Sequence, residues 1–540
     1  MNDRLQKRRF LCDLRFDEKG EITVFLALLF LVLLGFSLAV IEAVESYSAS
    51  YIAEDVVKNA GENIMANYNK ELFKNYHIFF LDPREKEYIL SDGKKYINQS
   101  LSGKSFFNIC CNSLDVIEKK AVVDDDGVYF KHEIREWMKY REKEKVANGI
   151  KDIAKDIQGN HEGKEQYDKD IREAEAEEQE IADKADNTVS QEDVGDTQKN
   201  ETETDTEEEQ VSPETQKERI TWKEIKEVLN TLMKAGVLSY AVDNPQGLSN
   251  KSISFHNLPS KTRGGILNDG KGEVEGALSF SDLKDIRKLF TSDVSIDTNS
   301  MLLTTDNYMI PYIEECFSCY QSSNRIKGKK QAANTAKKNE NNSKELFYET
   351  EYLISGKSSD LENLKAIANR ILTIRFMTNY ILSGQNIRLR TQIQIMSAAV
   401  SGFMGMPEAM KAVEVLIRTA VSYGESLLEL HTLFSGGEIP LIKSESDWNL
   451  DLKTMVKQLK EKKQVKKSKR NISYQDFLKI LLLTKGHSES LCYRMMDIMQ
   501  VNIARKEPEF LMENCLFSYK WKVDISIGSV SMELERQNNY

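Results

Sequence analysis

The longest apolar run lies close to the N-terminus. Residues 22–41 read ITVFLALLFLVLLGFSLAVI, which is 20 residues without a charged side chain. At about 1.5 Å of rise per residue, a helix of this length crosses a hydrocarbon core of roughly 30 Å. The apolar runs at 395–406 and 478–483 are too short to do so. The pattern therefore predicts one transmembrane helix.

The flanks of this run carry opposite charge. Basic residues precede it and acidic residues follow it: Arg4, Lys7, Arg8, Arg9, Arg15 and Lys19, then Glu42, Glu45, Glu54 and Asp55. Basic flanks stay in the cytoplasm, so the N-terminus is predicted inside the cell and the rest of the chain outside. The alternative is a cleaved secretory signal, whose apolar region is normally about 7–15 residues. The longer run, with Ser48-Ala49-Ser50 only beyond two glutamates, favours an uncleaved anchor in the cell membrane.

Helical spacing continues beyond the membrane run. Apolar residues recur about every four positions: Val44, Tyr47, Tyr51, Val56, Ala60, Ile64, Tyr68 and Leu72. This spacing is typical of an amphipathic helix, so the membrane helix is predicted to continue as a stalk, of coiled-coil character, that ends near Asn75. The HIFFLDP segment at 77–83 then predicts a buried strand that Pro83 ends.

Strand and helix patterns alternate along the rest of the chain. A strand is predicted at 113–123, a turn at 124–127, and a helix after it. Ser359 and Glu362 have the spacing of a capping box at the start of a long helix. Further helices are predicted at 220–236, where Gly236 ends the helix, from near Pro407, at 474–484 and at 488–505, with a break at 436–440.

Polar and apolar residues alternate strictly near the C-terminus. In 516–527, one set of positions is mostly aromatic or β-branched: Phe517, Tyr519, Trp521, Val523, Ile525 and Ile527. This is the pattern of a strand with one buried face. Because a lone strand must pair, we expect it to share a sheet with 77–81, which is the most apolar earlier strand.

These elements predict an α+β protein, with a single N-terminal transmembrane helix, a stalk, and a helix-rich ectodomain with a small, mostly antiparallel sheet. The expected segments are a cytoplasmic basic segment (1–21), the transmembrane helix (22–41), the stalk with the first part of the ectodomain (42–160), an acidic disordered linker (161–217), a middle segment (218–321), a basic polar loop (322–345), and a helical C-terminal part with the terminal strand (346–540).

Charge is unevenly distributed along the 540 residues. The net charge is −11, but residues 161–220 alone carry −15, so the rest is slightly basic. A segment so acidic and so poor in large apolar residues cannot offset its ordering entropy, which predicts a solvated linker whose first third could extend a helix. The basic segments 322–344 and 460–471 could contact an anionic surface or be solvated loops. They interleave no aromatic residues with the charge, which favours loops and argues against nucleic-acid binding.

Candidate chemistry is sparse. Cys316 and Cys319 form a CxxC, which could be two packed thiols, a disulfide, or half of a metal or redox site without its second half. Cys110 and Cys111 are adjacent, so a bridge between them would be strained, and the pairing of Cys492 and Cys515 is open. The sequence contains no phosphate-binding loop, nucleophile elbow, HExxH or dinucleotide-binding glycine pattern. We therefore predict no catalytic, cofactor-binding or metal-binding residue and no enzymatic activity.

The N-terminal segment KGEITVFLALLFLVLLGFSLAVIEAVESYSASY resembles TadE/TadG-like proteins of Flp (tight-adherence) pilus systems. Segments such as SYGESLLELHTLFSGGEIPLIKSESDW and YRMMDIMQVNIAR resemble an uncharacterised Gram-positive ectodomain family with the same N-terminus. A pilin-like signature has glycine before the apolar run, here Gly20, and glutamate five positions later. Here that position is Phe25 and the glutamate is Glu21, which argues against processing after Gly20.

The resemblance implies a membrane-anchored, extracytoplasmic component of pilus or secretion assembly. Its partners would be other pilin-like or assembly-complex membrane proteins. The alternatives are a ligand-binding or sensory ectodomain that works with a partner, an extracytoplasmic enzyme, and a minor pilin-like tip subunit. Small residues let membrane helices approach closely, and the apolar run contains Ala27, Gly35, Ser37 and Ala39. We therefore predict that the membrane helix and stalk, roughly 22–75, contact a similarly built pilin-like subunit. The alternative for this helix is an inert anchor whose stalk packs on its own ectodomain.

The predicted topology can be tested by labelling. A membrane-impermeant thiol reagent added to intact cells should fail to modify a cysteine placed at residue 5 and should modify one placed at residue 200. Labelling in the reverse pattern would contradict a cytoplasmic N-terminus.

Overall fold

The computed structural model describes residues 3–83, 86–101, 109–139, 165–174, 236–253, 257–263, 308–321, 345–403, 409–468, 471–485, 489–527 and 530–540, with isolated positions at 176 and between 224 and 234. The chain divides into two compact units. The anchor unit comprises Met1–Asp124 and Glu509–Tyr540, and the inserted unit is Asp125–Pro508. The inserted unit is thus the chain between two parts of the anchor unit.

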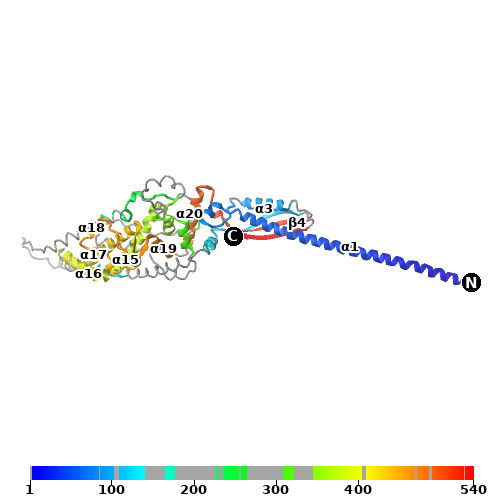
Figure 1. Ribbon diagram of the computed structural model, residues 1–540, viewed down its shortest axis with the longest axis horizontal. Coiled ribbons are helices and arrows are strands. Elements are labelled where there is room, and N and C mark those ends of the chain that lie inside the picture. The colour runs from blue at the N-terminus through cyan, green and yellow to red at the C-terminus, as the bar shows by residue number, and fades with distance from the viewer. Residues whose placement is uncertain are drawn as a thin grey trace, which may run out of the picture. The chain divides into compact units, whose positions relative to one another are not determined.

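The anchor unit begins with one very long helix. Helix α1 (Asp3–Met65) contains the apolar run and continues without interruption beyond it (Figure 1). Its later part buries one face, at Ala49, Ala53, Val57 and Ala60. These positions recur every three or four residues, so they form one stripe along the helix. Their small side chains let the helix approach the sheet described below.

The predicted stalk is interrupted earlier than the sequence pattern indicates. Helix α1 ends at Met65, and a separate short helix, α2 (Lys70–Tyr76), follows. Asn69 starts α2 because its side-chain oxygen accepts a hydrogen bond from the Leu72 amide at 2.8 Å. His77 ends α2 in a left-handed conformation, with φ of 58°. The apolar periodicity crosses this break because both helices bury one face.

The three strands of the anchor unit form an antiparallel sheet. β1 (Ile109–Ala121), β4 (Leu516–Ile527) and β5 (Val530–Asn539) lie in the order β1-β4-β5. The predicted alternation in β4 is confirmed, since Tyr519, Trp521, Val523 and Ile525 are all buried. Helices α1 and α3 (Lys86–Leu101) pack on this face, and they lie beside β4 in Figure 1.

The expected partner of the terminal strand is corrected in part. Residues 77–81 form no regular strand, and their one link to β4 is a bridge in which Leu81 and Leu516 exchange backbone hydrogen bonds of 3.0 and 2.7 Å. His77 has a left-handed backbone conformation, so the extended part of this segment begins only after it. β4 pairs along its length with β1, as Leu114 opposite Val523 shows, and with β5. The two ends of the chain do meet, but through β1 rather than through the HIFFL segment.

The inserted unit is mostly helical. Helices α15 (Asp360–Gln385) and α17 (Met410–Phe434) pack together, and α16 (Ile387–Phe403) packs on α17. Besides a helix at 165–174, the other α-helices and strands that the structure describes in this unit are α4 (Val128–Met138), α8 (Val237–Ala241), α9 (Pro259–Thr262), α12 (Met309–Cys316), α14 (Glu349–Ser355), β2 (Glu438–Pro440), α18 (Met455–Lys460), β3 (Asn471–Ser473), α19 (Tyr474–Lys485) and α20 (Glu489–Ala504). With the sheet of the anchor unit, this confirms a helix-rich α+β protein.

Several predicted boundaries agree with the structure. Ser359 caps α15 by accepting the Glu362 amide at 3.3 Å, although the Glu362 carboxylate bonds to Ser358 rather than completing the capping box. Helices α19 and α20 lie where the spacing predicts them. Helix α17 begins at Met410, close to Pro407, which lies outside the described residues. Helix α16 was not predicted, because its apolar residues are interleaved with arginine and glutamine.

Part of the acidic segment contradicts the prediction of a solvated linker. Residues 165–174 are helical, and Tyr167, Ile171 and Ala174 are buried. Asp170 accepts hydrogen bonds from Tyr380 at 2.9 Å and Arg418 at 2.6 Å. A few apolar residues at helical spacing thus suffice to dock this stretch, although its overall composition is polar. The remaining positions of 161–217 lie outside the described residues.

The two basic segments differ in what the structure describes. Residues 322–344 lie outside the described part of the chain. Within 460–468, Val465 is buried, and Lys462 donates to the carbonyl oxygens of Ser239 and Val242 at 3.5 and 3.3 Å. This second segment is therefore packed on the inserted unit rather than being a free loop.

Trp521 should dominate the stability of the anchor unit. Its ring is fully buried and packs edge-on against Tyr519, and a β-carbon at Gly93 would lie only 2.6 Å from it. Trp521→Ala should cost about 3–5 kcal/mol, because it removes a large core side chain and leaves a cavity. Hydrogen exchange in β1 and β5 of the full-length protein in detergent measures this loss.

Two further variants control this experiment. Lys522→Ala alters an exposed ion pair with Glu533 on the other face of the sheet and should leave exchange in β1 unchanged. Trp521→Phe should have a smaller effect than Trp521→Ala, because it keeps an aromatic ring in the core. Equal exchange in Trp521→Ala and the unaltered protein would show that β4 is peripheral to the unit.

Candidate functional site

The densest cluster of charged side chains lies in the core of the inserted unit. Helix α15 contributes Arg375, helix α17 contributes Glu425 and Glu429, and Lys443 follows β2. All four side chains are buried. Arg375 donates to both carboxylate oxygens of Glu429, at 2.8 and 3.0 Å. We call these four residues the buried quartet.

Hydrogen bonds satisfy the quartet internally. Lys443 donates to Glu425, to Glu429 at 2.7 Å and to Asn379 at 3.1 Å. Glu425 also accepts from the backbone amides of Asn449 and Leu450, at 3.1 and 2.9 Å. Burial by itself would raise the pKa of Glu429, but the adjacent Arg375 and Lys443 lower it to about 2. Two cations therefore balance two carboxylates.

The quartet joins elements rather than presenting a reactive group. Its members come from α15, α17 and the loop after β2, and the Arg375 guanidinium also donates to the Leu441 carbonyl at 3.4 Å. Each carboxylate oxygen of the quartet accepts at least one hydrogen bond from a neighbour. The spacing of Glu425 and Glu429, four residues apart on one helix face, was a signal in the sequence. The sequence did not reveal their burial, because every residue of α17 after Arg418 lies in the core, whether polar or apolar.

A second buried acid has a different environment. Glu351 on α14 is fully buried, and its Oε1 accepts hydrogen bonds from the Tyr320 amide at 2.9 Å and the Tyr474 hydroxyl at 2.7 Å. Its Oε2 finds no hydrogen-bond partner within the described residues. Burial raises the pKa of Glu351 to about 7, although these hydrogen bonds lower it in part. A substantial share of this carboxyl group is therefore protonated at neutral pH.

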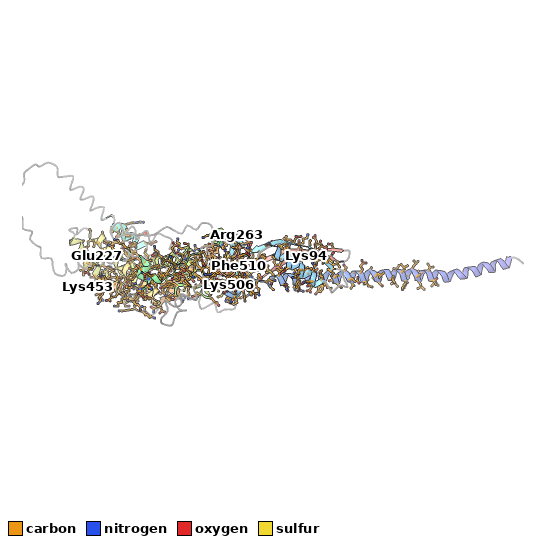
Figure 2. The ribbon with its side chains drawn as sticks, turned by 90° about the horizontal axis from the view of Figure 1, so that it is seen from above. Lys94, Glu227, Arg263, Lys453, Lys506 and Phe510 are labelled. Atoms are coloured by element: carbon orange, nitrogen blue, oxygen red, sulfur yellow. The ribbon has the colours of Figure 1, made fainter. Side chains whose placement is uncertain are left out.

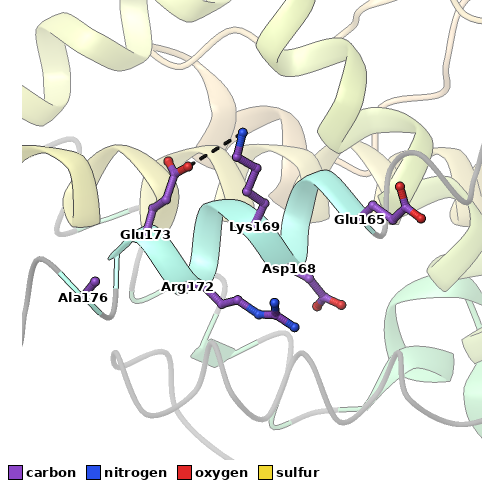
Figure 3. Close-up of a pocket in the computed structure, with 6 residues that line it drawn as sticks. All are labelled: Glu165, Asp168, Lys169, Arg172, Glu173 and Ala176. Carbon is purple, nitrogen blue, oxygen red and sulfur yellow. Dashed lines mark ion pairs between the residues drawn. The ribbon is translucent and has the colours of Figure 1, made fainter.

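A shallow hollow lies beside the helix at 165–174. It has a volume of about 490 Å³ and is lined by Glu165, Asp168, Lys169, Arg172, Glu173 and Ala176. Figure 3 shows that these side chains all leave one helix, with Lys169 and Glu173 on one side and Asp168 and Arg172 on the other. Lys169 and Glu173 form an exposed ion pair of 3.9 Å. Such a solvated helix face lacks the converging, desolvated groups that chemistry requires.

Six cysteines of the described chain form no disulfide bond: Cys110, Cys111, Cys316, Cys319, Cys492 and Cys515. Cys316 ends α12 and is half-buried, whereas Cys319, three residues on, is buried. Cys110 is exposed and Cys111 is buried, because neighbouring residues of β1 point to opposite faces of the sheet. Cys492 and Cys515 are both buried. Within the described part of the chain, no group of three or more histidine, cysteine or acidic side chains is arranged to hold a metal ion.

The exposed apolar surface gathers on α1. Of the twenty-four large exposed hydrophobic residues in the described part of the chain, eighteen lie on this helix, from Ile22 to Tyr51. Figure 2 shows their side chains projecting along the helix. A soluble domain rarely leaves so large an apolar surface in water. This is the one described helix long and apolar enough to cross a membrane, as a single-pass anchor or a signal sequence does.

The small residues singled out by the sequence lie on this surface. A β-carbon added at Gly35 would meet nothing within 4 Å. The Ser37 hydroxyl donates to the Leu33 carbonyl at 2.8 Å, so its hydrogen-bonding capacity is met inside the helix. Ala27 and Ala39 are exposed as well. Gly20 and Glu21 belong to α1, and their side-chain surroundings lie outside the described residues.

Residues 214–527 match a protein family described as a family of unknown function, DUF5702. The chain belongs to this family. The DUF5702 match ends at Ile527, the last residue of β4, so it includes the central strand of the anchor unit. Helix α1 and strand β1, which cover and pair with β4, precede the match. No curated protein and no solved structure matches the chain.

The raised pKa of Glu351 predicts a pH-dependent stability. The unfolded chain loses this proton near the ordinary value of 4.5, whereas the folded chain keeps it to about 7. Stability should therefore fall as pH rises from about 4.5 to about 7, and the loss should persist above that. Glu351→Gln mimics the protonated acid, so it should match the unaltered protein near pH 4.5 and be the more stable of the two near pH 8.

Urea unfolding of the full-length protein in detergent, followed by circular dichroism at both pH values, measures this difference. Glu445→Gln removes an exposed carboxylate and is the matched control, which should shift neither midpoint. A Glu351→Gln midpoint that differs from the unaltered protein by the same amount at both pH values would show that folding does not raise the pKa of Glu351.

Proposed function

We propose that this protein is a membrane-anchored, extracytoplasmic component of a Flp/Tad-type pilus or secretion assembly, and that it acts without catalysis. The observation that carries the proposal is the continuity of α1. One helix contains the membrane-crossing run at 22–41 and, in its later turns, the buried stripe that packs on the sheet of the anchor unit. Movement or contact of the membrane segment is therefore transmitted rigidly to a folded domain.

The same continuity supports an anchor over a cleaved signal. Cleavage at the small residues near Ser48-Ala49-Ser50 would remove the membrane run just where α1 begins to bury its face at Ala49. The basic residues before the run and the acidic residues after it support a cytoplasmic N-terminus. Together these features support a single-pass protein in which the inserted unit, and the part of the anchor unit that follows the membrane run at 22–41, lie outside the cell.

The points at which the chain enters and leaves the inserted unit also support a role in which the membrane-anchored domain carries this unit. The inserted unit leaves the anchor unit after β1 and returns at β4, which are neighbouring strands of one sheet. Both ends of the insertion are thus tied to the domain that carries the membrane helix. The buried quartet is satisfied internally, and the hollow over 165–176 is a solvated surface, which supports a binding role rather than a catalytic one.

One alternative within this class has support of its own. A minor tip subunit would share the anchor and stalk but need not pack repetitively. The size of the inserted unit, Asp125–Pro508, favours this variant over a repeating pilus subunit, because a large insertion burdens every repeat. The expected partners are the same in both cases, namely other membrane proteins of the assembly with a pilin-like helix.

Replacing residues 22–41 tests the proposal. An unrelated membrane helix of equal length should preserve the level of protein in the membrane but abolish assembly, because it removes the surface that contacts other helices. Pilus or complex formation, measured by electron microscopy and by co-purification, is the readout. A second replacement, a leucine helix that keeps Ala27, Gly35, Ser37 and Ala39, is the matched control and should restore assembly in part. Full assembly with the unrelated helix would mean that 22–41 serves only as an anchor.

A further inference from the structure

The stalk part of α1 has two unlike faces. Ala49, Ala53, Val57 and Ala60 are buried against the anchor unit. On the opposite face, Val44, Tyr47 and Tyr51 are exposed, with Tyr47 and Tyr51 keeping 77% and 68% of their surface in contact with solvent. Glu54 and Asp55 follow directly on this face and are also exposed. At 3.6 residues per turn, these five side chains fall within an arc of roughly 100°. We call them the stalk stripe.

The tyrosines of the stripe lie well beyond the end of the apolar run. Tyr47 and Tyr51 lie six and ten residues beyond Ile41, or about 9 and 15 Å along the helix. The headgroup layer adds only about 5–7 Å to the hydrocarbon core on each side. With the hydrocarbon ending at Ile41 and the helix along the membrane normal, the α-carbons of both tyrosines therefore stand above the headgroup layer. Large aromatic side chains left this exposed on a rigid element typically mark a protein-binding surface.

A second copy of the same chain fits this surface poorly. Two parallel copies in one membrane are held at the same height, so Glu54 and Asp55 of one would face Glu54 and Asp55 of the other. The next basic residue on this face is Lys58, one turn farther from the membrane run. Its Nζ lies 3.9 Å from Oε1 of Glu62 on the same helix, so it already forms an ion pair within its own chain. Like charges facing each other at a contact are unfavourable. A partner with basic residues would instead pair with the carboxylates and place its cations on the tyrosine rings.

We propose that the stalk stripe binds a helix of a different membrane-anchored protein, one that carries lysine or arginine about 13 residues outside its own membrane segment. The membrane sets this number, because Glu54 lies 13 residues beyond Ile41 and a parallel partner must present its cation at the same height, roughly 20 Å above the hydrocarbon. The inference rests on the proposed function, whose partner it specifies by charge and by register.

Site-specific photo-crosslinking in the native membrane tests this proposal. Benzoylphenylalanine replaces Tyr47 or Tyr51 in the full-length chain, and Ser46, which is exposed on another side of α1, is the matched control position. The stripe positions should give a discrete adduct with a different membrane protein, whose crosslinked peptide lies outside its apolar segment next to a lysine or arginine. The Ser46 position should not give this adduct.

Charge variants make the test decisive. Glu54→Lys with Asp55→Lys should reduce the Tyr51 adduct about tenfold, and reversing the partner's basic residue to glutamate should restore it. Glu54→Gln with Asp55→Asn, which keeps the shape of both side chains, should give an intermediate loss. Hydrogen exchange along α1 confirms that each variant is folded.

Several outcomes would overturn the inference. An adduct between two copies of this chain would assign the stripe to self-association, and an adduct with lipid alone would place the tyrosines in the membrane surface. An adduct insensitive to the charge of residues 54 and 55, or no adduct from a folded protein, would also contradict it. The replacement of 22–41 leaves the stripe intact, so loss of assembly there together with a self-adduct here would reject this inference and keep the proposed function.

Discussion

The anchor unit depends on the packing of one helix face against one strand. The later turns of α1 present small residues, mainly alanine, to the sheet. The side chains of Tyr519, Trp521 and Val523 on β4 pack in the same hydrophobic cluster. The Tyr519 hydroxyl donates to the Gly61 carbonyl at 3.2 Å, which joins residues 458 positions apart in the chain. Because β4 is the middle strand, it pairs with β1 along one edge and with β5 along the other. Without this contact the sheet would lose its buried face and α1 its support.

The inserted unit is held by polar groups as well as by its apolar core. The buried quartet joins α15, α17 and the loop after β2, and Asp170 ties the acidic segment to Tyr380 and Arg418. A buried ion pair gives little net stability compared with an apolar core, but removing one partner is costly. Such groups therefore specify one arrangement of helices. The hydrogen bonds of Glu425 and Glu429 on α17 are thus made to groups within the protein.

Sequence periodicity predicted the elements better than their partners. The alternation in 516–527 and the helices at 474–484 and 488–505 were predicted correctly, since each pattern reports a buried face that the residues themselves encode. The sequence analysis paired β4 with 77–81 instead of β1. Strand β1 has few buried residues, so polar and apolar residues alternate only weakly along it. The sequence allowed a helix in the first third of the acidic segment but not its burial, because three apolar residues in a strongly acidic stretch do not reveal that Tyr167 packs against Phe376 and Tyr380.

The sequence by itself determined the properties that depend on neighbouring residues: the membrane-crossing length of 22–41, the charge on its two sides, the class of the fold, and the tyrosines and acids along the stalk. Only the tertiary structure decided which stalk face is covered by the anchor unit and which is left in solvent. It also decided that Glu425 and Glu429 are neutralised by Arg375 and Lys443, while Glu351 keeps an oxygen without a partner in the described chain. The reason is physical, because burial and electrostatic environment are set by residues distant in the chain, and a local pattern does not contain them.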